Sequence, residues 1–121
     1  MTHCLIVDDS DVVRKVARRI FERMNFEVSE AENGHEAVER CKSKTPDLVL
    51  LDWQMPVMSG LEFLGALRLA KLEKRPFIIY CTTENDPADI ARAITAGADE
   101  FVLKPFNRES IEAKLTEVGL V

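Results

Sequence analysis

The chain has 121 residues, which is enough for one domain with a single hydrophobic core and too few for two. Apolar residues make up 46% of it and charged residues 31%, a balance typical of soluble globular proteins. The apolar runs are no longer than strands, the start lacks a signal-segment pattern, and the net charge is −5 with dispersed basic residues. We therefore expect neither membrane insertion nor direct nucleic-acid binding.

The three cysteines, Cys4, Cys41 and Cys81, are odd in number and show no CxxC spacing. This pattern favours small buried thiols over a disulfide framework or a metal site. It predicts a reducing environment, and we expect a cytoplasmic protein.

The N-terminal segment pairs a strand pattern with a helix pattern. Residues 4–7 are uniformly apolar and predict a buried strand. Either Ser10 or Asp11 can cap the helix that follows. Its apolar positions, at helical spacing, are Val13, Val16, Ala17, Ile20 and Met24.

A second strand and helix follow. Residues 26–30 alternate as strands do, and Asn33 with Gly34 makes a turn. Residues 35–43 then predict a helix, and Pro46 prevents its continuation. The inward positions of this helix are Ala37, Val38 and Cys41.

The third unit begins with residues 48–51, an apolar strand closed by Asp52. Ser59 and Glu62 have the spacing of a capping box and predict the start of a helix. The apolar positions assigned to this helix are Leu61, Leu64, Leu67 and Leu69.

The fourth unit is a strand at residues 77–81, followed by Thr82 and Thr83. A helix then starts with Asp86 as cap and a proline in its first turn, and Gly97 ends it.

The last strand covers residues 100–103 and runs to Lys104, and Asn107 can cap a fifth helix with Ile111, Leu115 and Val118 inside. Five strand–helix units with continuously apolar strands predict a doubly wound parallel sheet covered on both faces. Ligands of such folds bind beyond the carboxyl ends of the strands.

Charged side chains stand at those strand ends. Asp8 and Asp9 follow the first strand, Asp52 closes the third, and Lys104 closes the fifth. Like charges about 4 Å apart repel by roughly 4 kcal/mol in a surface-like dielectric, so the three carboxylates need either protonation with raised pKa values or a divalent cation. Oxygen ligands at this density suit Mg²⁺, and we expect an acidic magnesium pocket.

These positions carry a family resemblance. The segments Asp8-Asp9-Ser10, Asp52-Trp-Gln-Met-Pro56 with Gly60, Thr82, and Lys104-Pro105-Phe106 resemble the motif set of the bacterial response-regulator receiver domain. The resemblance covers residues 1–121 as a single receiver without an output domain, similar to the stand-alone CheY-like type. It implies a flavodoxin-like fold with strand order 2-1-3-4-5 and a cis peptide before Pro105.

The resemblance also implies a role for each site residue. Asp52 would be the phosphoacceptor, with Lys104 and Thr82 contacting phosphoryl oxygens and the main chain of Thr83 nearby. The magnesium ligands would be Asp8, largely through water, Asp9, Asp52 and the main-chain oxygen of Gln54.

The implied output is a protein-binding switch. The phosphoryl donor would be a histidine kinase or a histidine phosphotransfer protein. Thr82 and Phe101, which stands where the family commonly has tyrosine, would change a face within residues 87–118 that binds a downstream protein. The resemblance implies a signalling domain that promotes its own phosphorylation and dephosphorylation rather than an enzyme. We expect a monomer, with a phosphorylation-dependent dimer as the alternative.

Three other functional hypotheses stay open at this point. One is a magnesium-dependent aspartyl phosphatase or phosphotransferase acting on small molecules, for which this short chain offers little room. Another is a flavodoxin-like cofactor binder, although the acids from Asp8 to Asp11 would repel a phosphate after the first strand. The third keeps the receiver chemistry in a phosphate sink, a relay intermediate, or a receiver excised from a larger regulator or hybrid kinase.

Overall fold

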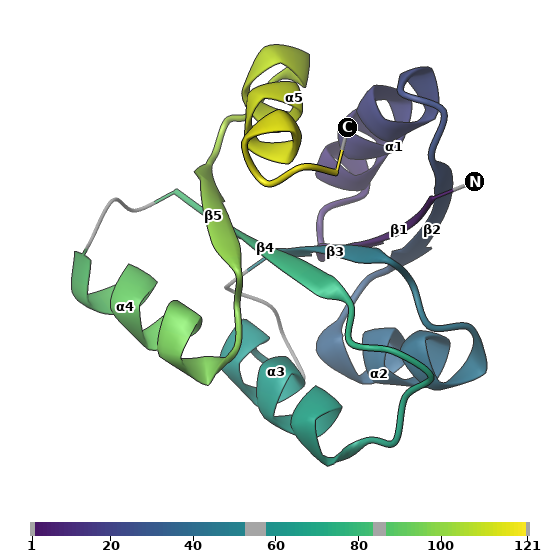
Figure 1. Ribbon diagram of the computed structural model, residues 1–121, viewed down its shortest axis with the longest axis vertical. Coiled ribbons are helices and arrows are strands. Elements are labelled where there is room, and N and C mark those ends of the chain that lie inside the picture. The colour runs from purple at the N-terminus through teal and green to yellow at the C-terminus, as the bar shows by residue number, and fades with distance from the viewer. Residues whose placement is uncertain (1, 53–57, 84–86, 121) are drawn as a thin grey trace.

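The computed structural model describes residues 2–52, 58–83 and 87–120, in which strands and helices alternate along the chain (Figure 1). The strands are β1 (His3–Val7), β2 (Glu27–Ala31), β3 (Leu48–Asp52), β4 (Phe77–Thr82) and β5 (Glu100–Leu103). The helices are α1 (Asp11–Arg23), α2 (Gly34–Ser43), α3 (Gly60–Leu69), α4 (Pro87–Ala96) and α5 (Arg108–Glu117).

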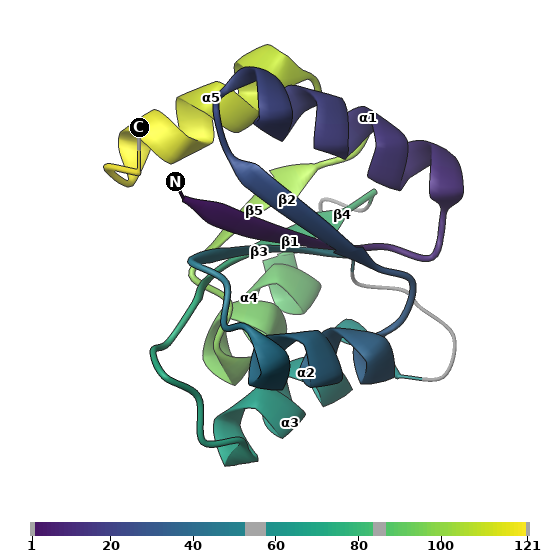
Figure 2. The same ribbon diagram turned by 90° about the vertical axis from the view of Figure 1, so that its right-hand side faces the viewer.

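The strands form one parallel sheet in the order β2-β1-β3-β4-β5. Figure 2 shows α1 and α5 on one face of this sheet and α2, α3 and α4 on the other. The predicted doubly wound fold and its strand order are therefore confirmed.

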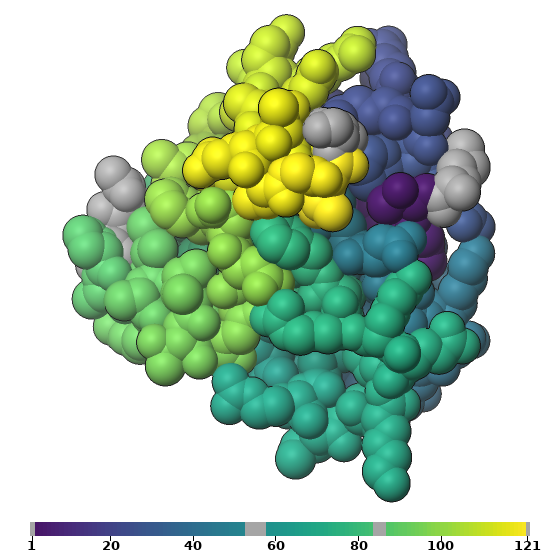
Figure 3. All heavy atoms as spheres, in the orientation of Figure 1, coloured from purple at the N-terminus to yellow at the C-terminus, as the bar shows by residue number. Residues whose placement is uncertain are grey.

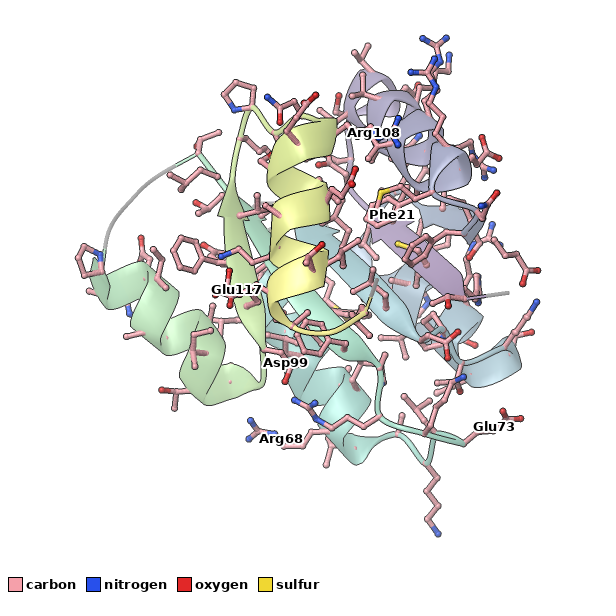
Figure 4. The ribbon with its side chains drawn as sticks, turned by 45° about the horizontal axis from the view of Figure 1, so that its top comes forward. Phe21, Arg68, Glu73, Asp99, Arg108 and Glu117 are labelled. Carbon is pink, nitrogen blue, oxygen red and sulfur yellow. The ribbon has the colours of Figure 1, made fainter. Side chains whose placement is uncertain are left out.

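Successive residues of the inner strands contribute to two separate hydrophobic clusters, one on each face of the sheet. In β1, Leu5 and Val7 join the cluster under α2, α3 and α4, whereas Cys4 and Ile6 join the cluster under α1 and α5. Because both faces are covered, every residue of β1 and β3 is buried, which explains why residues 4–7 and 48–51 are apolar without alternation. Phe21 of α1, labelled in Figure 4, packs edge-on against Phe26 with ring centroids 5.2 Å apart.

Helix starts follow the predicted caps. Ser10, rather than Asp11, caps α1, and its hydroxyl accepts the Val13 N–H at 3.2 Å. Ser59 and Glu62 form the expected capping box of α3. Asn33 and Asn107 accept N–H groups at the starts of α2 and α5 in the same way.

Three apolar assignments, in two helices, were wrong. In α3, Leu61 and Leu69 are exposed, Leu69 at 88%. The predicted Leu64 is buried, together with Phe63, which was not assigned. In α1, Val16 is 44% exposed, and Phe21 is fully buried. Apolar residues lie on more than one side of α3, so spacing alone did not identify its buried face.

None of the helices within the described residues has the length and apolar character needed to cross a membrane. All three cysteines lie in the described part of the chain and are buried, free thiols. Burial raises the pKa of the Cys41 thiol to about 12 and raises the pKa of Cys4 and Cys81 as well. These thiols are protonated packing groups.

Candidate functional site

The register of the sheet places the carboxyl ends of β1, β3, β4 and β5 side by side. Val7 is paired with Leu51, so Asp8 and Asp52 follow on neighbouring strands. Thr82 is paired with Leu103, so Lys104 lies just beyond it. Residues separated by up to 96 positions in the sequence therefore meet at one edge.

Lys104 joins two of the carboxylates. Its Nζ atom donates to Asp8 Oδ2 at 2.8 Å and to Asp52 Oδ1 at 2.9 Å. Its main-chain N–H donates to the Thr82 carbonyl at 2.8 Å, which ties the segment after β5 to the end of β4. Asp8 is 3% exposed and Asp52 is 7% exposed, so this ion pair is largely shielded from water.

Three aspartates form a group suited to a metal ion. One oxygen each from Asp8, Asp9 and Asp52 lies within 4.8 Å of the others. Asp9 is exposed and faces solvent, whereas the other two are buried. Oxygen donors with one side open to water match the preference of Mg²⁺, which retains several waters, so the residues present fit this ion.

The electrostatics of this group favour an added cation. Burial raises the pKa of Asp52; the Asp8 and Asp9 carboxylates add to the rise, and Lys104 opposes it. For Lys104 itself, burial would lower the pKa of the ammonium, but its hydrogen bonds to Asp8 and Asp52 outweigh burial and raise it. The charged form of Asp52 is thus disfavoured even with Lys104 in place, and a divalent ion would relieve this cost.

Arg14 of α1 is a contributor that the sequence analysis missed. Its side chain is buried, and Nη1 donates to the Asp8 main-chain oxygen at 2.6 Å while Nε donates to Glu30 at 3.1 Å. These contacts fix the segment that presents Asp8 and Asp9. The sequence did contain a signal for Arg14, because it lies between Val13 and Ala17 on the apolar side of the helix. Basic residues that only face solvent do not favour this side.

Comparison with known proteins identifies this arrangement. Residues 4–116 match the response regulator receiver domain. The chain belongs to this family. It is 38% identical to the chemotaxis protein CheY of Halobacterium salinarum over 94% of this chain and 93% of that protein. It is 39% identical to CheY of Bacillus subtilis over 88% of each.

Solved structures agree. The receiver fold matches chemotaxis protein CheY4 of Vibrio cholerae with a TM-score of 0.91 and 33% identity, covering 98% of both chains. Receiver domains of this CheY-like kind act in two-component signal transduction, where an aspartyl phosphate and Mg²⁺ are features of the family.

The receiver structure brings most of the predicted site residues to one place. Asp8, Asp9, Asp52 and Lys104 meet as described, and Thr82 is buried at the end of β4. Thr83 is exposed directly after it. The peptide between Lys104 and Pro105 is cis, as the resemblance implied.

The remaining predicted site residues are Gln54 and Phe101. The predicted main-chain ligand Gln54 is outside the described residues, as are Trp53 and Pro56 of the same motif and Asp86. Phe101 is half-buried on β5, with its ring beneath the Lys114 ammonium rather than in the acidic site.

Proposed function

We propose that residues 1–121 form one receiver domain in which Asp52 accepts a phosphoryl group from a histidine kinase or histidine phosphotransfer protein. The observation that carries the proposal is the buried Asp52 carboxylate, bonded to Lys104 at 2.9 Å and grouped with Asp8 and Asp9. Such a carboxylate is an oxygen nucleophile with neighbouring positive charge ready to stabilise transferred phosphate.

In the proposed transfer, an Asp52 oxygen forms the new bond to phosphorus. The bond between phosphorus and the donor imidazole nitrogen breaks, and its electron pair returns to the ring. Asp8, Asp9, Asp52 and the Gln54 main-chain oxygen would hold Mg²⁺, which would supply charge neutralisation at the phosphoryl oxygens. The protein therefore needs positioning and charge more than a general base.

Lys104 and the two threonines have separate roles in this proposal. The Lys104 ammonium, already beside Asp52, would shift to a phosphoryl oxygen. The Thr82 hydroxyl would donate to a second oxygen, with the main-chain N–H of Thr83 nearby. The Thr83 side chain would narrow the path to the phosphoryl group. The chain thus promotes both formation and loss of its own acyl phosphate.

The proposed output is a changed protein-binding face. The transferred group adds about one to two negative charges beside Thr82 and Lys104. Movement of Thr82 toward it would make room for Phe101, altering the face within residues 87–118. A complete switch, from about 1:99 to 99:1, requires a bias of about 5.5 kcal/mol, and a smaller bias gives a partial response. The partner on this face would be a downstream protein.

Labelling with acetyl phosphate and Mg²⁺ tests the phosphoacceptor. We expect the intact mass to rise by one phosphoryl group in the wild type and in Asp89→Asn, an aspartate on α4 that pairs with Arg92. Asp52→Asn should remain unlabelled, and chelation of the metal should suppress labelling of the wild type. Equal labelling of Asp52→Asn would contradict the assignment.

A second experiment distinguishes a binding switch from a phosphate sink or relay. Partner binding is compared between the beryllofluoride-loaded and untreated forms of the wild type and of Phe101→Ala. A switch predicts a partner that prefers the loaded wild type and loses that preference in the variant. Equal binding to both forms would favour the sink or relay.

A further inference from the structure

We infer that the groove between α3 and α4 binds an acidic, amphipathic segment of a partner protein. The groove consists of two adjoining hollows of about 330 Å³ and about 480 Å³, which share Arg68 and Ala96 as lining residues. Figure 3 shows the teal atoms of α3 and the segment after it beside the green atoms of α4. We call this surface the α3–α4 groove.

The floor of the smaller hollow is apolar. Leu64, Leu67, Leu72, Pro76 and Ile78 line it at the end of α3 and the start of β4. Its volume reaches the lower part of the range for ligand pockets, so it can take a large apolar side chain. Together with the second hollow along the helices, the groove is longer than one side chain and fits a polypeptide segment.

The charges of the groove point to an acidic occupant. All of the charged lining residues that the structure describes are basic, namely Arg68, Lys74, Arg75 and Arg92, in a chain whose net charge is −5. Lys74, Arg75 and Arg92 are offset by Asp47, Asp99 and Asp89. Within the described ion pairs no carboxylate reaches Arg68, whose Nη2 donates instead to the Ala96 carbonyl at 2.7 Å. Arg68 is the cation left to pair with a carboxylate from outside.

Gly65 gives an independent reason to expect an external occupant. It lies in the middle of α3 and lines the groove, and a Cβ atom built on it meets nothing within 4 Å among the described residues. Glycine in a helix interior costs about 0.5–1 kcal/mol relative to alanine. No contact within the described structure requires glycine at position 65. Close approach of a partner's backbone would require it.

The α3–α4 groove is separate from the acidic site. Its smaller hollow lies at the start of β4, while Asp52 and Lys104 lie at the opposite ends of their strands. Figure 4 shows Arg68 and Asp99 at this far end. A partner segment can therefore occupy the smaller hollow while Asp52 stays accessible.

The test uses two short synthetic peptides and the unphosphorylated protein without Mg²⁺. One peptide carries leucine and phenylalanine on one helical face and glutamate on the other; its counterpart has lysine at each glutamate. Amide NMR spectra should show shifts at Leu67, Ala96 and Gly97 with the acidic peptide, and the lysine counterpart should leave these signals unchanged.

Three variants locate the binding. Arg68→Glu should lower the affinity for the acidic peptide by about tenfold or more, because it places a negative charge where the carboxylate of the peptide would pair. Gly65→Leu should fill the groove and abolish binding while keeping the fold, since a Cβ atom at this position meets none of the described residues within 4 Å. Arg108→Glu, at the start of α5 on the other face of the sheet, should bind as the wild type does.

Results of three kinds would overturn the inference. They are absence of groove shifts at millimolar acidic peptide, equal binding of the lysine peptide, and unchanged binding to both Arg68→Glu and Gly65→Leu. Should Gly65→Leu fold poorly, Arg68→Glu and its Arg108→Glu control decide the question alone.

Discussion

The ammonium nitrogen of Lys114 lies 5.3 Å from the centre of the Phe101 ring and 3.5 Å from Oε1 of Glu100. A cation over an aromatic face contributes about 0.5–1 kcal/mol when partly exposed. Phe101 has no hydroxyl to anchor it, so this contact from α5 favours the ring position seen in the structure. Lys114 thereby links α5 to the residue proposed to switch.

Lys114→Met should release this hold on the ring. Loss of about 0.5–1 kcal/mol corresponds to a two- to fivefold larger population of the alternative ring position. The measurement is the chemical shift of the Phe101 ring protons without phosphorylation. Lys114→Arg retains a cation over the ring and should stay close to wild type. Identical spectra for Lys114→Met and the wild type would show that the contact does not control the ring.

Removal of Lys104 should destabilise the protein. Lys104→Met leaves Asp8 and Asp52 buried without their shared cation, and breaking a buried pair in this way costs about 3 kcal/mol. Because Mg²⁺ can replace the missing charge, part of the loss should return on its addition, and the ion should bind more tightly than in the wild type. Urea unfolding with and without Mg²⁺ measures both effects.

Lys44→Met is the control for this change. Lys44 pairs with Glu27 on the surface, where both side chains are about half exposed or more, and such pairs contribute about 0–1 kcal/mol. The free energy of unfolding of Lys44→Met should be close to that of the wild type. Mg²⁺ should change it by the same amount in both proteins. A loss for Lys104→Met no larger than that for Lys44→Met would mean that the carboxylates do not depend on the ammonium.

His3 should make stability depend on pH. The ring is 7% exposed, with Nε2 2.7 Å from Ser29 Oγ, and burial lowers its pKa from the ordinary 6.5. Between that lowered pKa and 6.5 the unfolded chain binds more protons, so the stability from neutral His3 is full above pH 6.5 and is lost as pH falls through this window.

His3→Gln can keep a bond to Ser29 without titrating. The free energy of unfolding, measured between about pH 7 and pH 5, should therefore fall more steeply for the wild type than for His3→Gln. Parallel slopes in the two proteins would remove His3 as the source. Changes common to both belong to the carboxylates, which are the same in each.

The fold was predictable because strand and helix patterns in this chain seldom conflict. The apolar runs at residues 4–7 of β1 and 48–51 of β3 indicate burial on both faces, and the polar groups at strand ends indicate the site. Topology alone then brings Asp8, Asp52 and Lys104 together, since parallel strands share one carboxyl edge. The sequence pattern was therefore sufficient for the acidic site.

Features that depend on contacts between helices were not predictable. Leu69 and Leu61 have the spacing of core residues, yet both are exposed, and Phe63 is buried beside the predicted Leu64. Arg14 became a site residue only through its bond to the Asp8 main chain, which no spacing rule encodes. The α3–α4 groove likewise depends on how two helices separate, a property of packing and not of either helix alone.

Gly65→Ala should stabilise the protein by about 0.5–1 kcal/mol, because it removes backbone freedom from the unfolded chain at a helical position. Nothing within 4 Å opposes the added methyl group among the described residues. Gly34→Ala is the contrasting change: its Cβ would lie 2.8 Å from a Met58 side-chain carbon and 3.0 Å from the Met58 carbonyl oxygen, so it should lower stability. Urea midpoints of the two variants should move in opposite directions from the wild type. A destabilising Gly65→Ala would mean that the chain itself fills the groove, and Gly65 would then no longer support an external occupant.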